Sequence, residues 1–271
     1  MRPALPKLAI LLMGPALSPA AHLSQPAADA FGRYITGVEA RLRAGPDQHV
    51  AISLGARAGA PVDREPELSA NTVRIEPVNG GSWEVNGGLL HHWRAAALVP
   101  GASPNDMLAL LRDPSRLSQY YAPQMVSSRV LTDGGGKRTT AMRFKKRQIV
   151  TIVLDAEFET ESGVRQGRGY SFSRSRHIWQ VDQPGTAQES RRAEGSDDGF
   201  LWRLNSYWSF EQKSEGLFLE CEAVSLTRDV PAGLGWLIMP IVKTLPRASL
   251  EFTLTATQNA LAAKRKEEAH Q

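Results

Sequence analysis

The sequence predicts an α+β fold in which a curved antiparallel sheet packs against one long C-terminal helix. Three observations predict this class: about six consecutive segments between residues 125 and 227 alternate apolar and polar residues, two short helix signals precede them, and an amphipathic segment follows them. Alternation with period two is typical of half-buried strands. A sheet and a helix that each have an apolar face can cover one another.

The segment before the sheet contains one helix signal. Residues 29–44 place Phe31, Ile35 and Val38 on one helical face, and a Gly-Pro pair follows directly. A short strand is expected at residues 50–54, and the next stretch is rich in Pro, Ala and charged residues, which is typical of a loop. We interpret residues 21–83 as an N-terminal extension and residues 84–268 as the main domain.

The main domain begins with a strand and two helices. The run "GLLHHWRAAALVP" from Gly88 to Pro100 has the length of a strand, and Pro100 ends it. Ser103 before Pro104, and Asp113 before Pro114, are each an N-cap residue followed by proline at the first helical position. Two short helices in tandem are therefore predicted after the first strand.

Six strands and a long helix complete the domain. The strands are expected at residues 125–132, 139–148, 149–160, 169–181, 199–210 and 217–227, with the spacing of an antiparallel meander. A helix is expected from about Pro246, with Leu250, Leu254 and Leu261 on one stripe. The segment "GLGWLIMP" before it is expected to be an apolar turn.

The N-terminus has the pattern of a secretory signal peptide over residues 1–20. Arg2 and Lys7 precede an apolar run, and small residues including Ser18 and Ala20 follow it. Cys221 is the only cysteine, so no internal disulfide can form. We therefore expect an exported protein, in the periplasm of a bacterium or secreted, whose fold depends on its core alone.

The element order, together with the segments "GLLHHW", "DDGFLWRLNSYWSFE", "ECEAVSLTRDVP" and "LPRASLEFTLTATQNAL", resembles exported bacterial members of the START-like (SRPBCC) superfamily. The resemblance covers Gly88 to about Lys266 and lies in the order of elements more than in any catalytic motif. It implies a helix-grip fold, in which the sheet curls around the last helix and leaves a cavity between them.

The strand alternation predicts which side chains line such a cavity, although an error of one residue in phase would turn a whole strand face over. Val126 and Val130 are expected to face inward on the strand that begins near residue 125. The predicted ligand-binding set is His91, Trp93, Met142, Phe144, Ile152, Leu154, Phe172, Arg174, Trp202, Leu204, Trp208 and Leu254. A lining of this kind suits a hydrophobic small molecule or a lipid. The competing interpretation is that these side chains pack on one another and leave no pocket.

Few residues suggest catalysis. His91 is a candidate general base or polar handle, although a hydrogen-bonded core histidine is favoured. His91 and His92 are adjacent on a strand and point to opposite faces, so no metal site is expected from them, and no cofactor motif occurs. The sequence thus favours binding without assigning catalytic residues.

We consider three function classes. The first is an exported carrier, sensor or transfer protein for a hydrophobic ligand. The second is an enzyme of the polyketide cyclase or aromatase type, which would require His91, Arg174 or Tyr207 to converge inside the cavity. The third is an interaction module with a filled core.

Two further partner classes follow from the sequence. The formal net charge of the whole chain is +4. Its basic clusters at residues 143–147 and 264–266 are interpreted as solvated surface, so no nucleic-acid partner is expected. The apolar residues Trp236 to Met239 are a candidate for transient membrane contact.

Overall fold

The chain is organised around one large antiparallel sheet. The computed structural model describes residues 21–44, 72–147, 151–165, 168–229 and 235–268. Within these residues the sheet has nine strands, eight of them in the spatial order β2-β3-β11-β10-β7-β6-β5-β4, while β8 pairs with β7. The strands are β2 (Val73–Val85), β3 (Gly88–Val99), β4 (Met125–Gly134), β5 (Lys137–Arg147), β6 (Thr151–Arg165), β7 (Arg168–Asp182), β8 (Ser190–Arg191), β10 (Arg203–Lys213) and β11 (Gly216–Thr227). A separate two-stranded sheet pairs β1 (Ala21–His22) with β9 (Ser196–Asp197).

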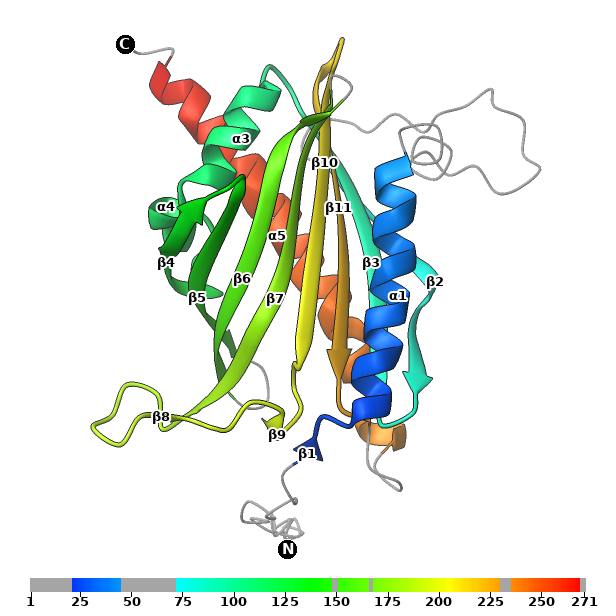
Figure 1. Ribbon diagram of the computed structural model, residues 1–271. Helices are drawn as coiled ribbons and strands as arrows, with labels where there is room; N and C mark the ends of the chain where they lie inside the picture. Colours follow the sequence, from blue (N-terminus) through cyan, green and yellow to red (C-terminus); the bar gives the residue numbers. More distant parts are fainter. Residues whose placement is uncertain (1–20, 45–71, 148–150, 166–167, 230–234, 269–271) are drawn as a thin grey trace, which may run out of the picture.

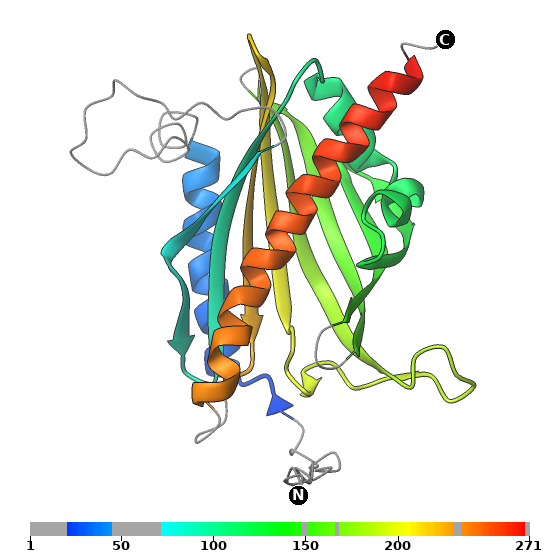
Figure 2. The same cartoon turned by 180° about the vertical axis from the view of Figure 1, so that it is seen from behind.

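Helices cover both faces of the sheet. They are α1 (Gln25–Ala44), α3 (Pro104–Arg112), α4 (Pro114–Tyr120) and α5 (Gly235–Glu268). Helix α5 runs diagonally across one face, with α3 and α4 beside it, whereas α1 lies along the opposite face (Figures 1 and 2). The predicted α+β class and the helix-grip arrangement are confirmed.

The start of α3 is built as its sequence predicts. The Ser103 hydroxyl accepts a hydrogen bond from the Asp106 N–H (3.2 Å), and the Ser103 N–H donates to the Asp106 carboxylate (2.9 Å). This reciprocal capping box satisfies two N–H groups that the first helical turn would otherwise leave unpaired. Asp113 is the N-cap of α4 but makes no capping hydrogen bond through its side chain.

Helix α5 is longer than predicted. It begins at Gly235 rather than near Pro246, so the described part of the segment that was expected to be an apolar turn, from Gly235 to Pro240, is helical. Pro240 and Pro246 lie inside this helix, where each lacks an N–H for the hydrogen-bond ladder but can still accept a hydrogen bond through its carbonyl. The expectation of a turn before the helix was therefore wrong.

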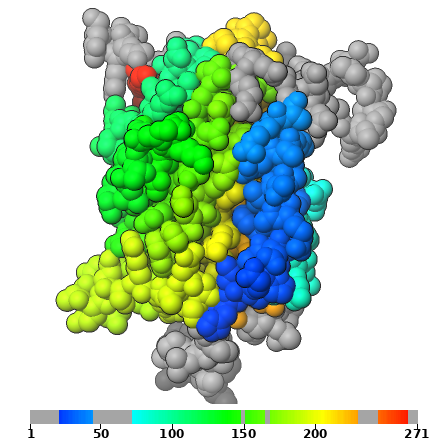
Figure 3. Space-filling model, viewed as in Figure 1, coloured from blue at the N-terminus to red at the C-terminus, as the bar shows by residue number. Residues whose placement is uncertain are grey.

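The N-terminal extension contributes to the sheet. The predicted boundary at residue 84 falls inside β2, which pairs with β3 along most of its length. Helix α1 packs against the same sheet, where it forms a continuous ridge in the space-filling view, beside the uncovered strands of the other half (Figure 3). The expected strand at residues 50–54 and the predicted signal peptide lie outside the described residues.

Successive residues of the central strands therefore enter two different cores. The core beneath α5 takes residues of one parity from β3, β10 and β11, including Ala95, Ala97, Trp208, Phe210, Leu217 and Leu219. The core beneath α1 takes residues of the other parity, including Leu90, Tyr207, Val224 and Leu226. Strand β3 is accordingly buried along nearly its whole length.

Candidate functional site

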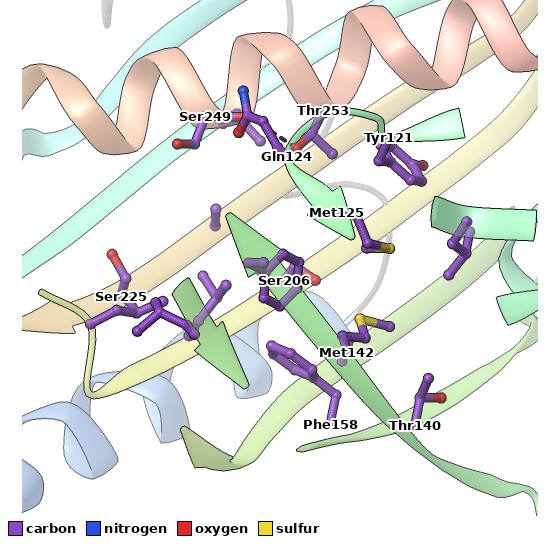
Figure 4. Close-up of a pocket in the computed structure, with 18 of the residues that line it drawn as sticks. Tyr121, Gln124, Met125, Thr140, Met142, Phe158, Ser206, Ser225, Ser249 and Thr253 are labelled. Carbon is purple, nitrogen blue, oxygen red and sulfur yellow. Dashed lines mark hydrogen bonds between the residues drawn. The ribbon is translucent and has the colours of Figure 1, made fainter. Parts of the chain in front are cut away.

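A large cavity lies between the sheet and helix α5. Its volume is about 1400 Å³, and its walls come from β4, β5, β6, β7, β10 and β11, from α3 and α4, and from the middle of α5. Small-molecule pockets usually measure about 300–1,000 Å³, so this cavity has room for a lipid-sized molecule. Figure 4 shows its two sides, with Ser249 and Thr253 on α5 facing Met142, Phe158 and Ser206 on the sheet.

Much of the floor of the cavity is apolar. The lining side chains that create this character are Met142, Phe144, Ile152, Leu154, Phe158, Leu204 and Trp208 from the sheet, and Leu250 and Phe252 from α5. The lining residues of β5 and β6 lie on one face, because the two strands pair in a register that places Phe144 opposite Leu154 and Met142 opposite Ala156. Contact with such a surface would favour a hydrophobic ligand.

A group of hydroxyls crosses the same floor. The Thr160 hydroxyl donates to Ser173 Oγ (3.0 Å), and the Ser162 hydroxyl donates to Ser171 Oγ (2.8 Å). Ser206 on β10 lies directly opposite Ser173 in the strand register. We call these five residues the hydroxyl belt. Because each hydroxyl is both donor and acceptor, the belt can bind oxygen atoms carried by an otherwise apolar ligand.

Several charged groups at the cavity wall form ion pairs within the protein. The Arg138 guanidinium donates to Asp133 (2.6 Å), and Arg192 donates to Asp182 and Asp198 (2.8 Å each). These carboxylates compensate the charge of each guanidinium inside the protein itself.

Lys146 makes a different set of contacts. Its ammonium donates to Gln124 Oε1 and to Ser249 Oγ, at 3.3 Å in each case. Both acceptors are neutral. Burial lowers the pKa of this half-buried lysine, since no carboxylate offsets the loss of solvation.

Six of the twelve predicted ligand-binding residues line the cavity. They are Met142, Phe144, Ile152, Leu154, Leu204 and Trp208. Alternation alone predicts that these six side chains point inward, because successive residues of a strand point to opposite faces of the sheet. The inward face of each of these strands contacts the cavity or the core beneath α5. Their contact with a ligand stays a prediction.

Phe172 and Arg174 lie on the opposite face. They do share one face of β7, as alternation predicts, but Phe172 is buried in the core beneath α1 and Arg174 pairs with Glu39 on that helix. The cavity side of β7 carries Ser171 and Ser173 instead. The prediction that the aromatic side faces the cavity was wrong, because α1 gives the apolar side chains a second place to be buried.

Trp202 is also turned away from the cavity. Strand β10 begins only at Arg203, and Gly199 has a positive φ of 72° that bends the chain before it. The Trp202 indole N–H donates to Asp197 (3.1 Å), and the ring is buried beneath α1. The alternation that relates Trp202 to Trp208 therefore does not extend to residue 202, and its predicted inward position was wrong.

His91, Trp93 and Leu254 lie in the interior but do not line the cavity. The His91 ring contacts Ser82 Oγ (2.8 Å) and Thr227 Oγ1 (3.0 Å), as expected for a hydrogen-bonded core histidine. Trp93 packs against Gly81, where an added Cβ would lie 2.6 Å from the indole ring. Leu254 is fully buried in the core beneath α5. Their predicted place in the lining was wrong because contacts within the protein enclose each of these side chains.

The edge strand β4 departs from its predicted phase. Val126 and Val130 are half-exposed at 50% and 42%, whereas Met125 lines the cavity. The pairing of β4 with β5 shifts register twice, after Met125 and after Val130. Each irregularity changes which residues point inward, so simple alternation fails on this strand.

The three residues that a cyclase would have required do not converge. Arg174 and Tyr207 meet beneath α1, where both contact Glu39, while His91 is enclosed between Ser82 and Thr227. Burial raises the pKa of the cavity residue Tyr121 to about 12 and that of Cys221 well above its usual range. Both groups are therefore protonated near neutral pH.

The described residues contain neither a cluster of metal-binding residues nor a helix that could span a membrane. In the described ranges, no group of three or more His, Cys, Asp or Glu residues is arranged to hold a metal ion. No helix in the same part of the chain has both the length and the apolar character needed to span a bilayer. The candidate membrane-contact residues Trp236 to Met239 belong to the first turns of α5, and their side chains lie outside the described part.

Sequence reasoning missed the polar residues of the cavity. The hydroxyl belt has a visible signal, since Ser171 and Ser173 alternate with Tyr170 and Phe172 along β7. Alternating serines usually indicate a solvent face, and only the presence of α1 on the other side reverses that interpretation. Lys146 belongs to a basic run that was interpreted as solvated surface, so nothing in the sequence distinguished it from its neighbours.

The α1 face is held by buried charged groups. Arg174 donates two hydrogen bonds to the Glu39 carboxylate (2.5 and 2.9 Å), which also accepts one from the Tyr207 hydroxyl (3.1 Å). Burial alone would raise the pKa of Glu39, but the hydrogen bonds and charge of Arg174 outweigh it and lower the pKa.

A second polar cluster fixes the same helix to strands β3 and β11. Glu222 of β11, which is almost fully buried, accepts hydrogen bonds from His92 (2.8 Å) and from Arg41 of α1 (2.5 Å). The Tyr34 hydroxyl contacts the other ring nitrogen of His92 (2.7 Å). Burial opposes ionisation of Glu222, but these donors lower its pKa to about 2.

Comparison with known proteins found structural similarity only. No known protein family and no curated protein matches the sequence. A STAR-related lipid transfer protein from Xanthomonas axonopodis is 14% identical, with a TM-score of 0.43 over 70% of this chain and 98% of the other. The Zhui aromatase/cyclase from Streptomyces sp. R1128 is 10% identical, with a TM-score of 0.43 over 66% and 96%. A START superfamily protein from Mycobacterium smegmatis is 13% identical, with a TM-score of 0.42 over 65% and 99%. Similarity at this level assigns no activity to this chain.

Proposed function

We propose that this protein binds a hydrophobic small molecule or lipid in the cavity between its sheet and helix α5. The observation that carries the proposal is the combination of size and lining: about 1400 Å³ bounded by a mainly apolar floor. A filled core would leave few voids larger than a water molecule, so a space of this size calls for an occupant.

The polar groups of the cavity support binding more than catalysis. The floor carries the hydroxyl belt, and its thiol and phenol groups have raised pKa values that keep them protonated. The candidate base His91 does not line the cavity, and its ring is hydrogen-bonded to the Ser82 and Thr227 hydroxyls. A carrier or sensor needs only shape, apolar surface and a few orienting hydrogen bonds, and the cavity supplies these.

We also propose that the protein is exported, on the strength of the signal-peptide pattern at residues 1–20. N-terminal sequencing of the protein recovered from the periplasm or culture medium would test this, with a mature end near residue 21 expected. Recovery of the full-length chain from the cytoplasm alone would contradict it. Transient membrane contact through Trp236 to Met239 belongs to the same proposal, and a Trp236→Ser, Leu237→Ser variant should then float less with liposomes than the unmodified protein.

The binding proposal is tested by native mass spectrometry, followed by denaturing extraction of any retained molecule. We expect either a retained apolar compound or, for the emptied protein, micromolar binding of the neutral dye Nile red. Ser206→Trp places a bulky ring in the cavity floor and should weaken dye binding at least fivefold. Ser127→Trp, on the exposed side of β4, is the matched control and should leave it unchanged. Absence of both retained ligand and dye binding would overturn the proposal.

A further inference from the structure

The ammonium group of Lys146 lies where three elements of the cavity wall meet. Lys146 belongs to β5, Gln124 to the connection between α4 and β4, and Ser249 to α5, and all three line the cavity. Figure 4 shows Gln124 and Ser249 close together beside helix α5. The two hydrogen bonds of 3.3 Å hold the charged end of Lys146 at this junction.

The charge at this junction is not balanced by the protein. No carboxylate of the described residues forms an ion pair with Lys146, whereas Lys137, Arg138 and Arg192 of the same lining each pair with at least one. The neighbouring Lys145 also lines the cavity but is exposed to solvent. The ammonium is half-buried, so water solvates it only in part, and its neutral partners cannot offset that loss. An ammonium in this position binds an anion more favourably than one on an open surface, since solvent screens it less.

We propose that Lys146, with Gln124 and Ser249, forms a subsite for the acidic headgroup of the cavity ligand, so that the ligand is an apolar chain or ring system with one carboxylate or phosphate at its end. This inference rests on the proposed binding function and names the class of ligand. The Lys146 ammonium pairs with an anionic oxygen, the Gln124 amide N–H₂ and the Ser249 hydroxyl are placed to donate to the same headgroup, and the apolar body lies along Met142, Phe144 and Leu154.

Three probes with one C16 chain test the headgroup: palmitic acid, hexadecyl phosphate and hexadecanol, each used to displace Nile red from the delipidated protein. We expect at least one acidic probe to bind about tenfold more tightly than the alcohol, as a charge-assisted hydrogen bond implies. The difference between the carboxylate and phosphate arms then identifies the acid. Equal affinity for all three probes would overturn the inference and leave the binding function standing, whereas failure of all three probes and of Nile red would overturn both.

Substitutions test whether the preference for an acidic probe depends on Lys146. Lys146→Met keeps the length of the side chain without its charge, and it should abolish the preference for the acid while leaving hexadecanol affinity within about twofold. Arg147→Met removes one positive charge from the next residue, which is exposed and outside the cavity lining, and it should retain the preference. Should Lys146→Met fail to fold, as judged by circular dichroism, Lys146→Gln provides the same test. An equal loss of preference in Arg147→Met would show a general charge effect and would overturn the subsite.

Discussion

The two faces of the sheet differ in the polar groups that they bury. Beneath α1, charged side chains are buried and each of the central carboxylates, Glu39 and Glu222, is paired with arginine or histidine. Beneath α5, the sheet instead carries mainly apolar side chains and neutral hydroxyls, with charged groups such as Lys146 in the cavity wall, and a large volume is left unfilled. One strand supplies both environments, since Tyr207 faces α1 and Trp208 faces the cavity.

The difference between the two faces indicates that one has a structural role and the other a role in binding. A buried ion pair contributes little net stability but is costly to break, so it specifies where α1 docks on the sheet. A cavity costs stability, because its lining side chains lack partner atoms on one side. We conclude that the α1 face fixes the architecture and that the α5 face keeps the space in which a ligand binds.

The largest expected effect is on the α1 face. Glu222→Ala leaves His92 and Arg41 without their carboxylate and should lower the free energy of unfolding by about 3 kcal/mol, as measured by urea denaturation. Glu84→Ala, at an exposed carboxylate on β2, is the control and should change it by less than about 0.5 kcal/mol. Similar effects of the two substitutions would show that the buried cluster does not hold α1.

One leucine-to-alanine substitution on each face of the sheet compares how tightly the two faces are packed. Leu226→Ala removes a fully buried side chain from the core beneath α1 and should cost about 3 kcal/mol of unfolding free energy. Leu204→Ala removes a side chain that already borders the cavity, loses fewer contacts and should cost about 1 kcal/mol. Equal costs in thermal unfolding of the ligand-free protein would mean that the cavity lining is packed as tightly as the α1 face.

We expect acidification to reduce the stability that the buried carboxylates of the α1 face contribute. The pKa of Glu222 is lowered to about 2 and that of Glu39 is also lowered in the folded protein, so the unfolded chain takes up protons at higher pH than the folded one. Their stabilising contribution is present above the unfolded pKa and is lost as pH falls through the folded pKa. We expect the unfolding free energy to fall by about 1–2 kcal/mol between about pH 5 and pH 3.

The measurement is the urea midpoint as a function of pH. Glu222→Gln should flatten the dependence, because the group that titrates has been removed. Burial raises the pKa of Asp197, and this group acts in the opposite direction, since protonation relieves its desolvation in the folded state. A midpoint that rises on acidification would contradict the prediction for Glu222 and Glu39.

The smallest expected effect concerns the hydroxyl belt. Ser173→Ala with Ser206→Ala removes two hydroxyls from the cavity floor and should change stability by less than about 1 kcal/mol. The double variant should bind 12-hydroxystearic acid a few-fold more weakly while its affinity for stearic acid stays unchanged, as measured by Nile red displacement. A parallel loss for both acids would indicate a change of cavity shape and would exclude hydrogen bonding by the belt.

The order of the main elements from β3 to α5 could be predicted from the sequence, but the strands β1, β2, β8 and β9 were not predicted. Period-two alternation predicted β5, β6, β7, β10 and β11, and the N-cap residue Ser103 before Pro104 predicted the start of α3, because these signals depend on a residue and its near neighbours. Alternation also grouped residues by face correctly within β5, β6 and β7, since neighbouring side chains of a strand must point to opposite sides.

Whether a group of side chains faces the cavity or the core beneath α1 depends on the tertiary structure, because packing of the helices determines what covers each face of the sheet. Phe172 and Arg174 share a face by local geometry, but the docking of α1 on that face places them away from the cavity. Lys146 is one cation in a basic run until Gln124 and Ser249, 22 and 103 residues distant in sequence, enclose its ammonium. Local periodicity carries no information on what covers a surface, because burial and charge pairing depend on contacts between segments far apart in the chain.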